Sequence, residues 1–170
     1  MKLMGIFLLI GLVSFNLTAK TAEQLRAAYL MQIPSFVKYK SSDARLPLIN
    51  FCFVNQLGPV GSLIQQQQRS LQKRINFTLK ILNPDDEEVF QTCHYLYLSD
   101  EVEKPIDVIN QVSSDMITVA ENQKALKDGA TMALVQENNK IKIHINRTSL
   151  AKSDFTFRAR LMALSEIADY

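Results

Sequence analysis

The chain has 170 residues, a formal net charge of +2 and 47% hydrophobic residues, and it contains no tryptophan. Lysine and arginine alternate with acidic residues and form no basic block, so the pattern speaks against a nucleic-acid partner. The composition is normal for a mixed α/β globule and excludes a disordered or fibrous chain.

The first 19 residues are predicted to be a cleavable signal peptide. Lys2 precedes an apolar run from Gly5 to Phe15, and a short polar stretch then ends in the small residue Ala19. The run is about eleven residues long, well short of the roughly 20 that cross a hydrocarbon core. Cleavage after Ala19 leaves residues 20–170, which we expect to form a single domain. An uncleaved membrane anchor is the alternative.

Helices and strands are predicted to alternate along the remaining chain. Apolar residues recur at helical spacing from Thr21 to Lys38, with Pro34 disturbing the last turn, and the apolar run Pro47 to Val54 is typical of a buried strand. A short helix then carries Val60, and Arg74 to Leu82 alternates like a strand with one wet face.

The second half repeats this alternation and ends in a hairpin and a helix. Strands are expected at 95–98 and 116–119, and helices at 105–112 and 123–127. Strands at 131–136 and 140–145 flank a tight turn, and a final helix over 157–168 is expected to bury Leu161, Leu164 and Ile167. The fold class is therefore α/β: a three-layer sandwich whose mostly parallel sheet has helices on both faces and an antiparallel C-terminal hairpin.

Two cysteines, Cys52 and Cys93, follow the signal segment. An even number of cysteines in an oxidising compartment favours a disulfide, which would close a loop of about 40 residues and contribute roughly 4 kcal/mol. Free thiols are an alternative. A metal site is a weaker one, because there is no C-x-x-C motif and zinc would need His94 and His144 to converge on the same point.

Residues that could perform catalysis are scarce. His94 and His144 are interpreted as sheet-surface residues, and no nucleophile elbow, P-loop or dinucleotide fingerprint appears. We therefore expect no catalytic residues, no metal and no cofactor. The four acidic residues at 85–88 are interpreted as a solvated charge run.

One turn carries a weak ligand signal. The segment from Gly58 to Ser62 lies where a strand turns into a helix, and backbone N–H groups at such a place can bind an anion. The candidate ligand residues are Gly58, Gly61 and Ser62. A plain tight turn is the alternative.

Four blocks of the sequence, in order and covering nearly all of residues 20–170, resemble the YfiR/HmsC-like family of bacterial periplasmic proteins. The blocks are the opening helix Leu25 to Val37, the strand Asn50-Phe51-Cys52-Phe53-Val54, the segment Cys93-His94-Tyr95-Leu96-Tyr97-Leu98-Ser99, and the close Ile143-His144-Ile145-Asn146 with Ala159-Arg160-Leu161. The chain departs from the family pattern at three places: Tyr39-Lys40 stands for Trp-Pro, Asp128-Gly129 for Gly-Gly, and Ala159 for serine.

The resemblance implies a regulator and not an enzyme. Members of the family are similar in acting as periplasmic repressors of an inner-membrane diguanylate cyclase, whose periplasmic sensor region they engage, and so in controlling cyclic-di-GMP and biofilm formation. It also implies that Cys52 pairs with Cys93, and that Asn146 and Arg160 are structural residues. A second copy of the chain, forming a homodimer, is an alternative partner.

Two other functions remain as alternatives. A periplasmic small-ligand sensor or carrier predicts a pocket at the strand ends near Gly58 to Ser62, and an enzyme ranks third because no catalytic set can be assembled. A protein-binding module instead predicts an exposed apolar patch on the first helix or around Phe155 and Phe157.

Overall fold

The computed structural model describes residues 20–40, 48–85 and 90–170. The expected signal peptide, the expected start of the second element at Pro47, and most of the acidic run at 85–88 lie outside the described residues. Sequence expectations for those segments therefore stay predictions.

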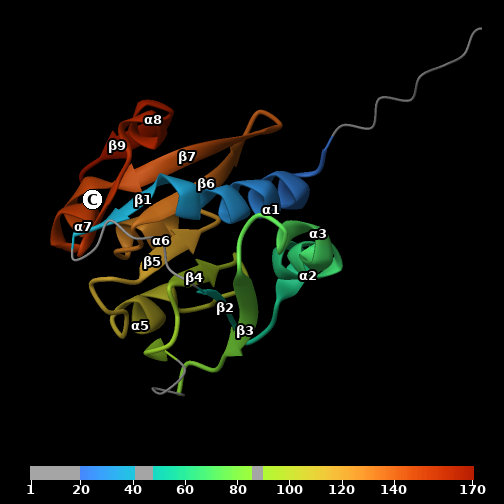
Figure 1. Cartoon of the computed structure of the whole chain (residues 1–170). Helices are drawn as coiled ribbons and strands as arrows, with labels where there is room; N and C mark the ends of the chain where they lie inside the picture. Colours follow the sequence, from blue (N-terminus) through green and yellow to red (C-terminus); the bar gives the residue numbers. More distant parts are fainter. Residues whose placement is uncertain (1–19, 41–47, 86–89) are drawn as a thin grey trace, which may run out of the picture.

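A seven-stranded sheet forms the centre of the molecule (Figure 1). Its spatial order is β3-β2-β4-β5-β6-β7-β9, and every neighbouring pair is parallel except β6 and β7. The strands are β2 (Ile49–Val54), β3 (Phe77–Leu82), β4 (Tyr95–Leu98), β5 (Ile117–Ala120), β6 (Met132–Glu137), β7 (Lys140–Asn146) and β9 (Ser165–Ala168). The predicted α/β sandwich with a mostly parallel sheet and an antiparallel hairpin is confirmed.

Helices cover both faces of this sheet, with α2 and α5 on opposite sides in Figure 1. One face lies under α1 (Ala22–Gln32), α2 (Gly58–Gln66) and α3 (Gln68–Leu71), and the other under α5 (Pro105–Ile109) and α6 (Gln123–Lys127). Successive side chains of a strand point to opposite faces, so Phe51 and Phe53 of β2 pack on the α1 side while Cys52 and Val54 pack on the α6 side.

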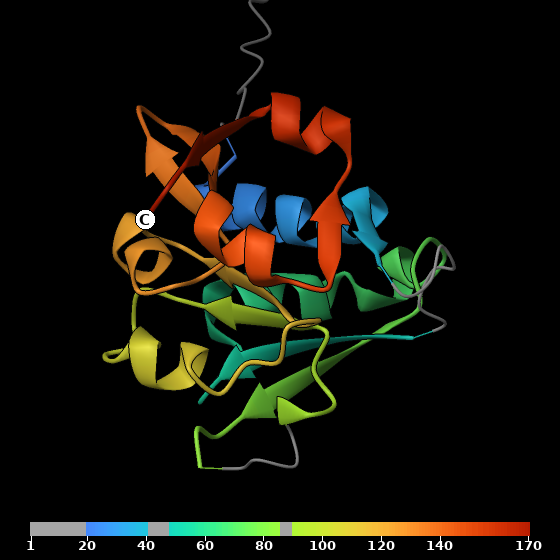
Figure 2. The ribbon, with the colours of Figure 1, turned by 90° about the vertical axis from the view of Figure 1, so that its left-hand side faces the viewer.

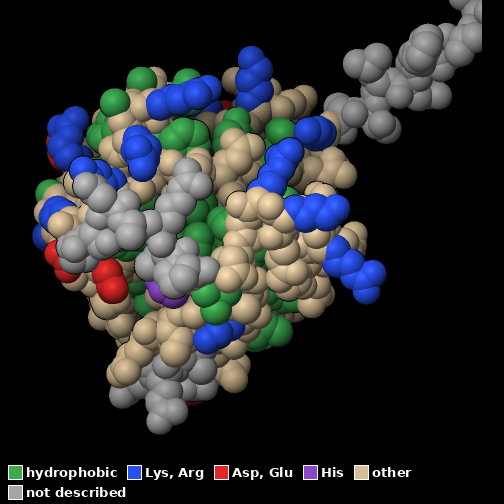
Figure 3. Space-filling model, in the orientation of Figure 1, with side chains coloured by type: hydrophobic (Ala, Val, Ile, Leu, Met, Phe, Trp, Pro, Cys, Tyr) green, Lys and Arg blue, Asp and Glu red, His purple; other side chains and the backbone are tan. Residues whose placement is uncertain are grey.

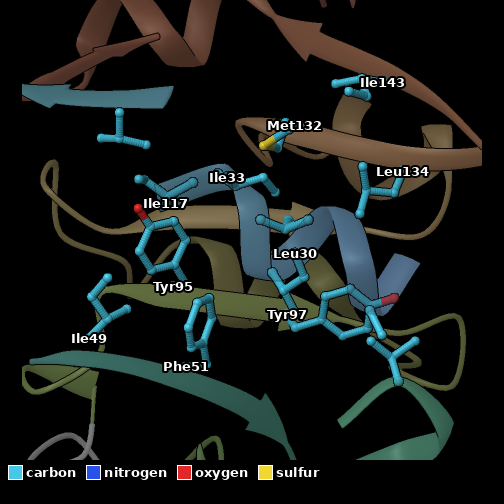
Figure 4. Close-up of a cluster of buried hydrophobic side chains, with 14 of the residues drawn as sticks. Leu30, Ile33, Ile49, Phe51, Tyr95, Tyr97, Ile117, Met132, Leu134 and Ile143 are labelled. Carbon is cyan, nitrogen blue, oxygen red and sulfur yellow. The ribbon is translucent and has the colours of Figure 1, made fainter. Parts of the chain in front are cut away.

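The core on the α1 side is rich in large side chains. Figure 4 shows Leu30 of α1 and Ile33, the residue just after it, pointing toward Phe51, Tyr95 and Tyr97 of the sheet. The rings of Phe51 and Tyr95 lie 5.0 Å apart, and those of Phe53 and Tyr97 lie 5.5 Å apart. This aromatic layer is what seats α1 on the sheet.

The first helix is shorter than its apolar spacing predicts. Thr21 and Gln24 form a capping box at its start, but the α-helix ends at Gln32. A 3₁₀ turn, η1 (Ile33–Phe36), follows, and β1 (Val37–Tyr39) then runs as a strand. Pro34 is the physical reason, because its ring clashes with the carbonyl four residues earlier and it donates no backbone hydrogen bond.

The predicted final helix over 157–168 is wrong. The segment forms β8 (Phe155–Phe157), the short α8 (Ala159–Ala163) and β9, and Figure 2 shows this part of the chain in red and orange passing over α1. β8 pairs antiparallel with β1, and β9 adds to β7 at the end of the large sheet. Leu161 is buried as expected, but Leu164 is 67% exposed, because the helix has ended before it.

The expected apolar patch around Phe155 and Phe157 is also absent, because both rings are buried. They lie on β8 and pack into the core on the α1 side, where Phe155 contacts the ring of Tyr39 at a centroid distance of 6.2 Å. The remaining helix, α7 (Arg147–Lys152), joins β7 to β8. The hairpin turn uses Asn138 and Asn139 with φ of 47° and 61°, which asparagine tolerates well.

Candidate functional site

The cysteines form the predicted disulfide. Cys52 lies in the middle of β2 and Cys93 lies just before β4, with their Cα atoms 5.9 Å apart and a sequence separation of 41. Both are buried on the α6 side of the sheet. The alternatives of free thiols and of a metal bound through these cysteines are excluded by the bond.

Hydrogen bonds around His94 join the same two segments as the disulfide, namely β2 and the residues just before β4. The backbone N–H of Asn50 donates to His94 Nδ1 at 3.1 Å, and the backbone N–H of His94 donates to the carbonyl of Asn50 at 3.0 Å. Burial lowers the pKa of His94, which keeps Nδ1 free to accept. His94 therefore holds the entry to β4 against β2, and its ring already has a structural partner.

His144 is buried, which corrects the interpretation of it as a sheet-surface residue. It sits on β7 between two glutamates from neighbouring strands, with Nε2 3.2 Å from Glu137 Oε1 and Nδ1 3.7 Å from Glu166 Oε2. The Lys142 ammonium contacts the same two carboxylates at 2.9 and 2.7 Å. We name these four residues the β7 ring.

The ligating atoms of Glu137, His144 and Glu166 lie within 4.8 Å of one another, which is close enough for a metal ion. However, Lys142 already supplies a cation to both glutamates, and its contacts raise its pKa above the usual range. The β7 ring is therefore best described as an ion-pair network that joins β6, β7 and β9.

The residues of the candidate ligand turn lie at the carboxyl end of β2. Gly58 begins α2 with a φ of +59°, a conformation that glycine adopts without strain. At Gly61 a Cβ atom would meet Leu57 at 3.0 Å and Phe53 at 3.1 Å, so its small size lets α2 pack closely on the sheet. Ser62 is half-buried in the same helix. A ligand role for Gly58, Gly61 and Ser62 stays a prediction.

The two family-matching residues differ in their surroundings. Asn146 is buried at the end of β7, where its Nδ2 donates to the carbonyl of Leu126 in α6 at 2.9 Å and its Oδ1 caps α7 by accepting from the backbone of Ser149. Arg160 is exposed on α8. Asn146 thus fastens α6 and α7 to the sheet.

Sequence reasoning missed a buried cluster of charged and polar side chains that is formed by Arg26, Glu121 and Tyr97. Arg26 of α1 is buried; its Nε donates to the carbonyl of Leu134 at 3.0 Å, and its guanidinium lies 3.8 Å from the Glu121 carboxylate. The Tyr97 hydroxyl donates to the same carboxylate at 2.6 Å. Burial, and then the neighbouring Glu121 charge, raise the pKa of Tyr97. One signal was present in the sequence: Arg26 falls on the apolar side of the first helix, beside Ala27 and Leu30.

A cavity of about 870 Å³ between α1 and α2, which we name the α1–α2 groove, could hold a ligand. It lies at the amino ends of the parallel strands, since Ile49 and Tyr95 begin β2 and β4 and both line it. Gly58, Gly61 and Ser62 are not among its lining residues. The pocket is thus at the opposite end of β2 from the place that sequence reasoning favoured.

Apolar side chains form much of the inner wall of the groove, and basic side chains line it too. Apolar contributors include Ala27, Ile64 and Leu71, while Lys20, Lys38, Arg74 and Arg158 are basic. No aspartate or glutamate of the described residues lines it. Figure 3 shows apolar side chains in a hollow on this face, with several Lys and Arg side chains around it.

Tyr39 adds a polar group to the groove wall. Its hydroxyl oxygen is buried and faces the Tyr95 hydroxyl, which also belongs to a residue that lines the groove. Burial raises the pKa of Tyr39 to about 12, so the hydroxyl keeps its proton at neutral pH and can donate a hydrogen bond.

In the described ranges, neither histidine is hydrogen-bonded to a serine, threonine or cysteine side chain. The polar groups that the fold brings together are engaged with one another, as in the β7 ring and the Arg26 cluster. What the arrangement offers chemically is binding at the groove.

A family model described as YfiR/HmsC-like matches residues 23–166, which span all four blocks that carry the sequence resemblance. No curated protein matches the sequence.

Solved structures show the same fold in other proteins. A conserved domain protein from Vibrio cholerae aligns with a TM-score of 0.58 at 12% identity over 86% of this chain and 59% of its own. An ABC domain in complex with L-Trp from Streptococcus pneumonia aligns with a TM-score of 0.58 at 8% identity over 86% of this chain and 60% of its own. This chain thus spans about three fifths of the length of these structures, and at such low identity the likeness concerns the fold.

Proposed function

Because the chain belongs to the YfiR/HmsC-like family over residues 23–166, we propose that it is a periplasmic regulator that represses an inner-membrane diguanylate cyclase. The family consists of periplasmic regulators of such cyclases and is not catalytic. By binding the periplasmic sensor region of the cyclase, the protein would lower cyclic-di-GMP and restrain biofilm formation. The match across most of the chain is the observation that carries this proposal.

Two structural observations support it. The Cys52–Cys93 disulfide suits an oxidising compartment. Among the residues that the structure describes, no helix has the length and apolar character that a membrane crossing requires.

The proposal is tested by deleting the gene and measuring cellular cyclic-di-GMP. We expect the level to rise in the deletion strain and to return to normal when the gene is restored. In parallel, a tagged copy of the protein recovered from solubilised membranes should carry with it a membrane protein with a GGDEF domain. Unchanged cyclic-di-GMP together with no such partner would reject the proposal.

The disulfide allows a sharper version of this test. A strain carrying Cys52→Ala and Cys93→Ala should show raised cyclic-di-GMP because less folded repressor is present. An immunoblot of the protein from the same cells separates lost protein from lost binding. If abundance and cyclic-di-GMP both match the wild type, the bridge has no part in regulation.

A further inference from the structure

We propose that the α1–α2 groove binds a small organic anion that has an apolar body and lacks an amino group. The observation is the combination of a large cavity with basic lining residues and, among the described lining residues, no acidic ones. This inference goes beyond the proposed regulation of a cyclase and does not depend on it.

The size and walls of the groove fit a small molecule with an apolar body. Ligand sites in proteins commonly have volumes of about 300–1,000 Å³ and mostly apolar walls with a few polar groups. The groove has a volume of about 870 Å³ and presents Ile64 and Leu71 from α2 and α3, and Ala27 and Met31 from α1. An aromatic or branched body can therefore lie between the two helical segments.

The positive charge of the side chains that line the groove favours a negatively charged ligand. Lys20, Arg74 and Arg158 line it, and no ion pair joins any of the three to an acidic residue in the ranges that the structure describes. Arg26 and Lys142 differ, because each contacts a glutamate. A carboxylate or sulfonate in the groove would thus be the counter-charge that these side chains lack.

The absence of aspartate and glutamate from the described lining residues also disfavours a class of ligand. On entering the groove, the ammonium group of an amino acid would lose its bound water. It would find no carboxylate among the described lining residues to pair with, and it would lie among cations. A plain carboxylate is therefore favoured over an amino acid with the same side chain. The Tyr39 hydroxyl, which is protonated at neutral pH and lines the groove, is a further polar group that can donate a hydrogen bond to the anionic group.

Three matched probes test which ligand charge the groove prefers. Each is titrated into the purified full-length protein. They share a naphthalene ring and a short chain: 3-(2-naphthyl)propionate is an anion, 3-(2-naphthyl)alanine a zwitterion, and 2-(2-naphthyl)ethylamine a cation. We expect the propionate to bind at least tenfold more tightly than the alanine in calorimetry, and the amine to show no binding. Equal affinity of all three probes, or no binding of the propionate at millimolar concentration, would overturn the proposal.

Paired variants test the place of binding. Arg74→Gln with Arg158→Gln should weaken binding of the propionate at least tenfold, whereas Arg69→Gln, an exposed arginine on α3 outside the groove, should leave it unchanged. Ala28→Trp should fill the groove and block binding. Ala151→Trp is its control, because Ala151 is an exposed alanine of α7 that does not line the groove.

Backbone amide shifts from NMR provide the readout that does not depend on affinity. The propionate should shift amides of α1, α2 and the start of β2, and melting curves of each variant confirm that it is folded. Shifts confined to another surface, or an Arg69→Gln effect equal to that of the groove variants, would contradict the assignment. Neither outcome bears on cyclic-di-GMP, so failure here is distinct from failure of the proposed regulation.

Discussion

The two faces of the large sheet are built from the same strands but differ in how they are closed. On the α6 side the strands present small or compact side chains such as Cys52, Ala120 and Ala133, and the disulfide lies there. On the α1 side they present Phe51, Tyr95 and Tyr97, and the groove opens between α1 and α2. The α6 side is thus fastened covalently, and the α1 side leaves room for a ligand.

Each face also has its own buried polar link between helix and sheet. On the α1 side Arg26 binds the carbonyl of Leu134 and approaches Glu121. On the α6 side Asn146 binds the carbonyl of Leu126. The first link contains charges and the second is neutral, so loss of a partner should cost more on the α1 side. This difference can be tested by mutation.

The largest effect is expected from removing the disulfide on the α6 side. Cys52→Ala with Cys93→Ala should lower the free energy of unfolding by about 4 kcal/mol, because the 41-residue separation is no longer restrained in the unfolded chain. Urea unfolding followed by circular dichroism measures this. The wild type in reductant should match the variant, and an unchanged midpoint would show that the bridge does not fasten this face.

The next effect concerns the charged link on the α1 side. Glu121→Gln keeps an acceptor for the Tyr97 hydroxyl but leaves the buried Arg26 without its carboxylate, and we expect a loss of about 3 kcal/mol in unfolding free energy. Arg26→Met combined with Glu121→Gln should recover part of that loss, because no buried charge then remains. If the double variant is no more stable than the single one, the ion pair is not the cause.

A smaller effect is expected from the neutral link on the α6 side. Asn146→Ala removes the hydrogen bond to Leu126 and the cap of α7, and we expect a loss of about 2 kcal/mol. Asn110→Ala, at an exposed position after α5, is the control and should change the unfolding midpoint little. A loss as large as that of Glu121→Gln would erase the expected difference between the two links.

The last effect is confined to alkaline pH and is a pH dependence of the α1 side. Burial raises the pKa of Tyr39 from its usual 10 to about 12 and also raises those of Tyr95 and Tyr97, and all three pack on this face. The folded protein then holds protons that the unfolded chain releases, so stability is complete below pH 10 and falls as pH rises from 10 toward 12. Urea midpoints across this range should fall, and Tyr39→Phe should reduce the fall. A pH-independent midpoint would mean that these hydroxyls ionise as freely in the folded state.

Much of this architecture could be predicted from the residues. The apolar runs of β2 and β4 and the periodicity around Val60 identify elements whose local pattern agrees with their final place. The cysteine pair was also predictable, because two cysteines in a chain that resembles an exported protein allow one pairing. The site was predicted less well: the glycine turn was inferred at one end of β2, and the groove lies at the other.

The Arg26 cluster shows why the rest could not be predicted. Arg26 and Glu121 lie 95 positions apart, and nothing local to either indicates that Tyr97 completes the contact. The groove poses the same problem on a larger scale, since its basic side chains come from the residues just before α1, from β1, from the loop before β3 and from the residue after β8. Their convergence depends on how helices pack on the sheet.

The sequence by itself determined the order of the main strands and helices from β2 to β7, the cysteine pair and the family, because these depend on local patterns and on motifs that are contiguous in the chain. Only the tertiary structure decided the fate of the last segment and the shape of the groove. Residues 157–168 were predicted to be a helix, yet β8 pairs with β1 and β9 pairs with β7. Hydrogen bonds offered by distant strand edges outweighed a weak local preference, and such edges exist only once the fold has formed.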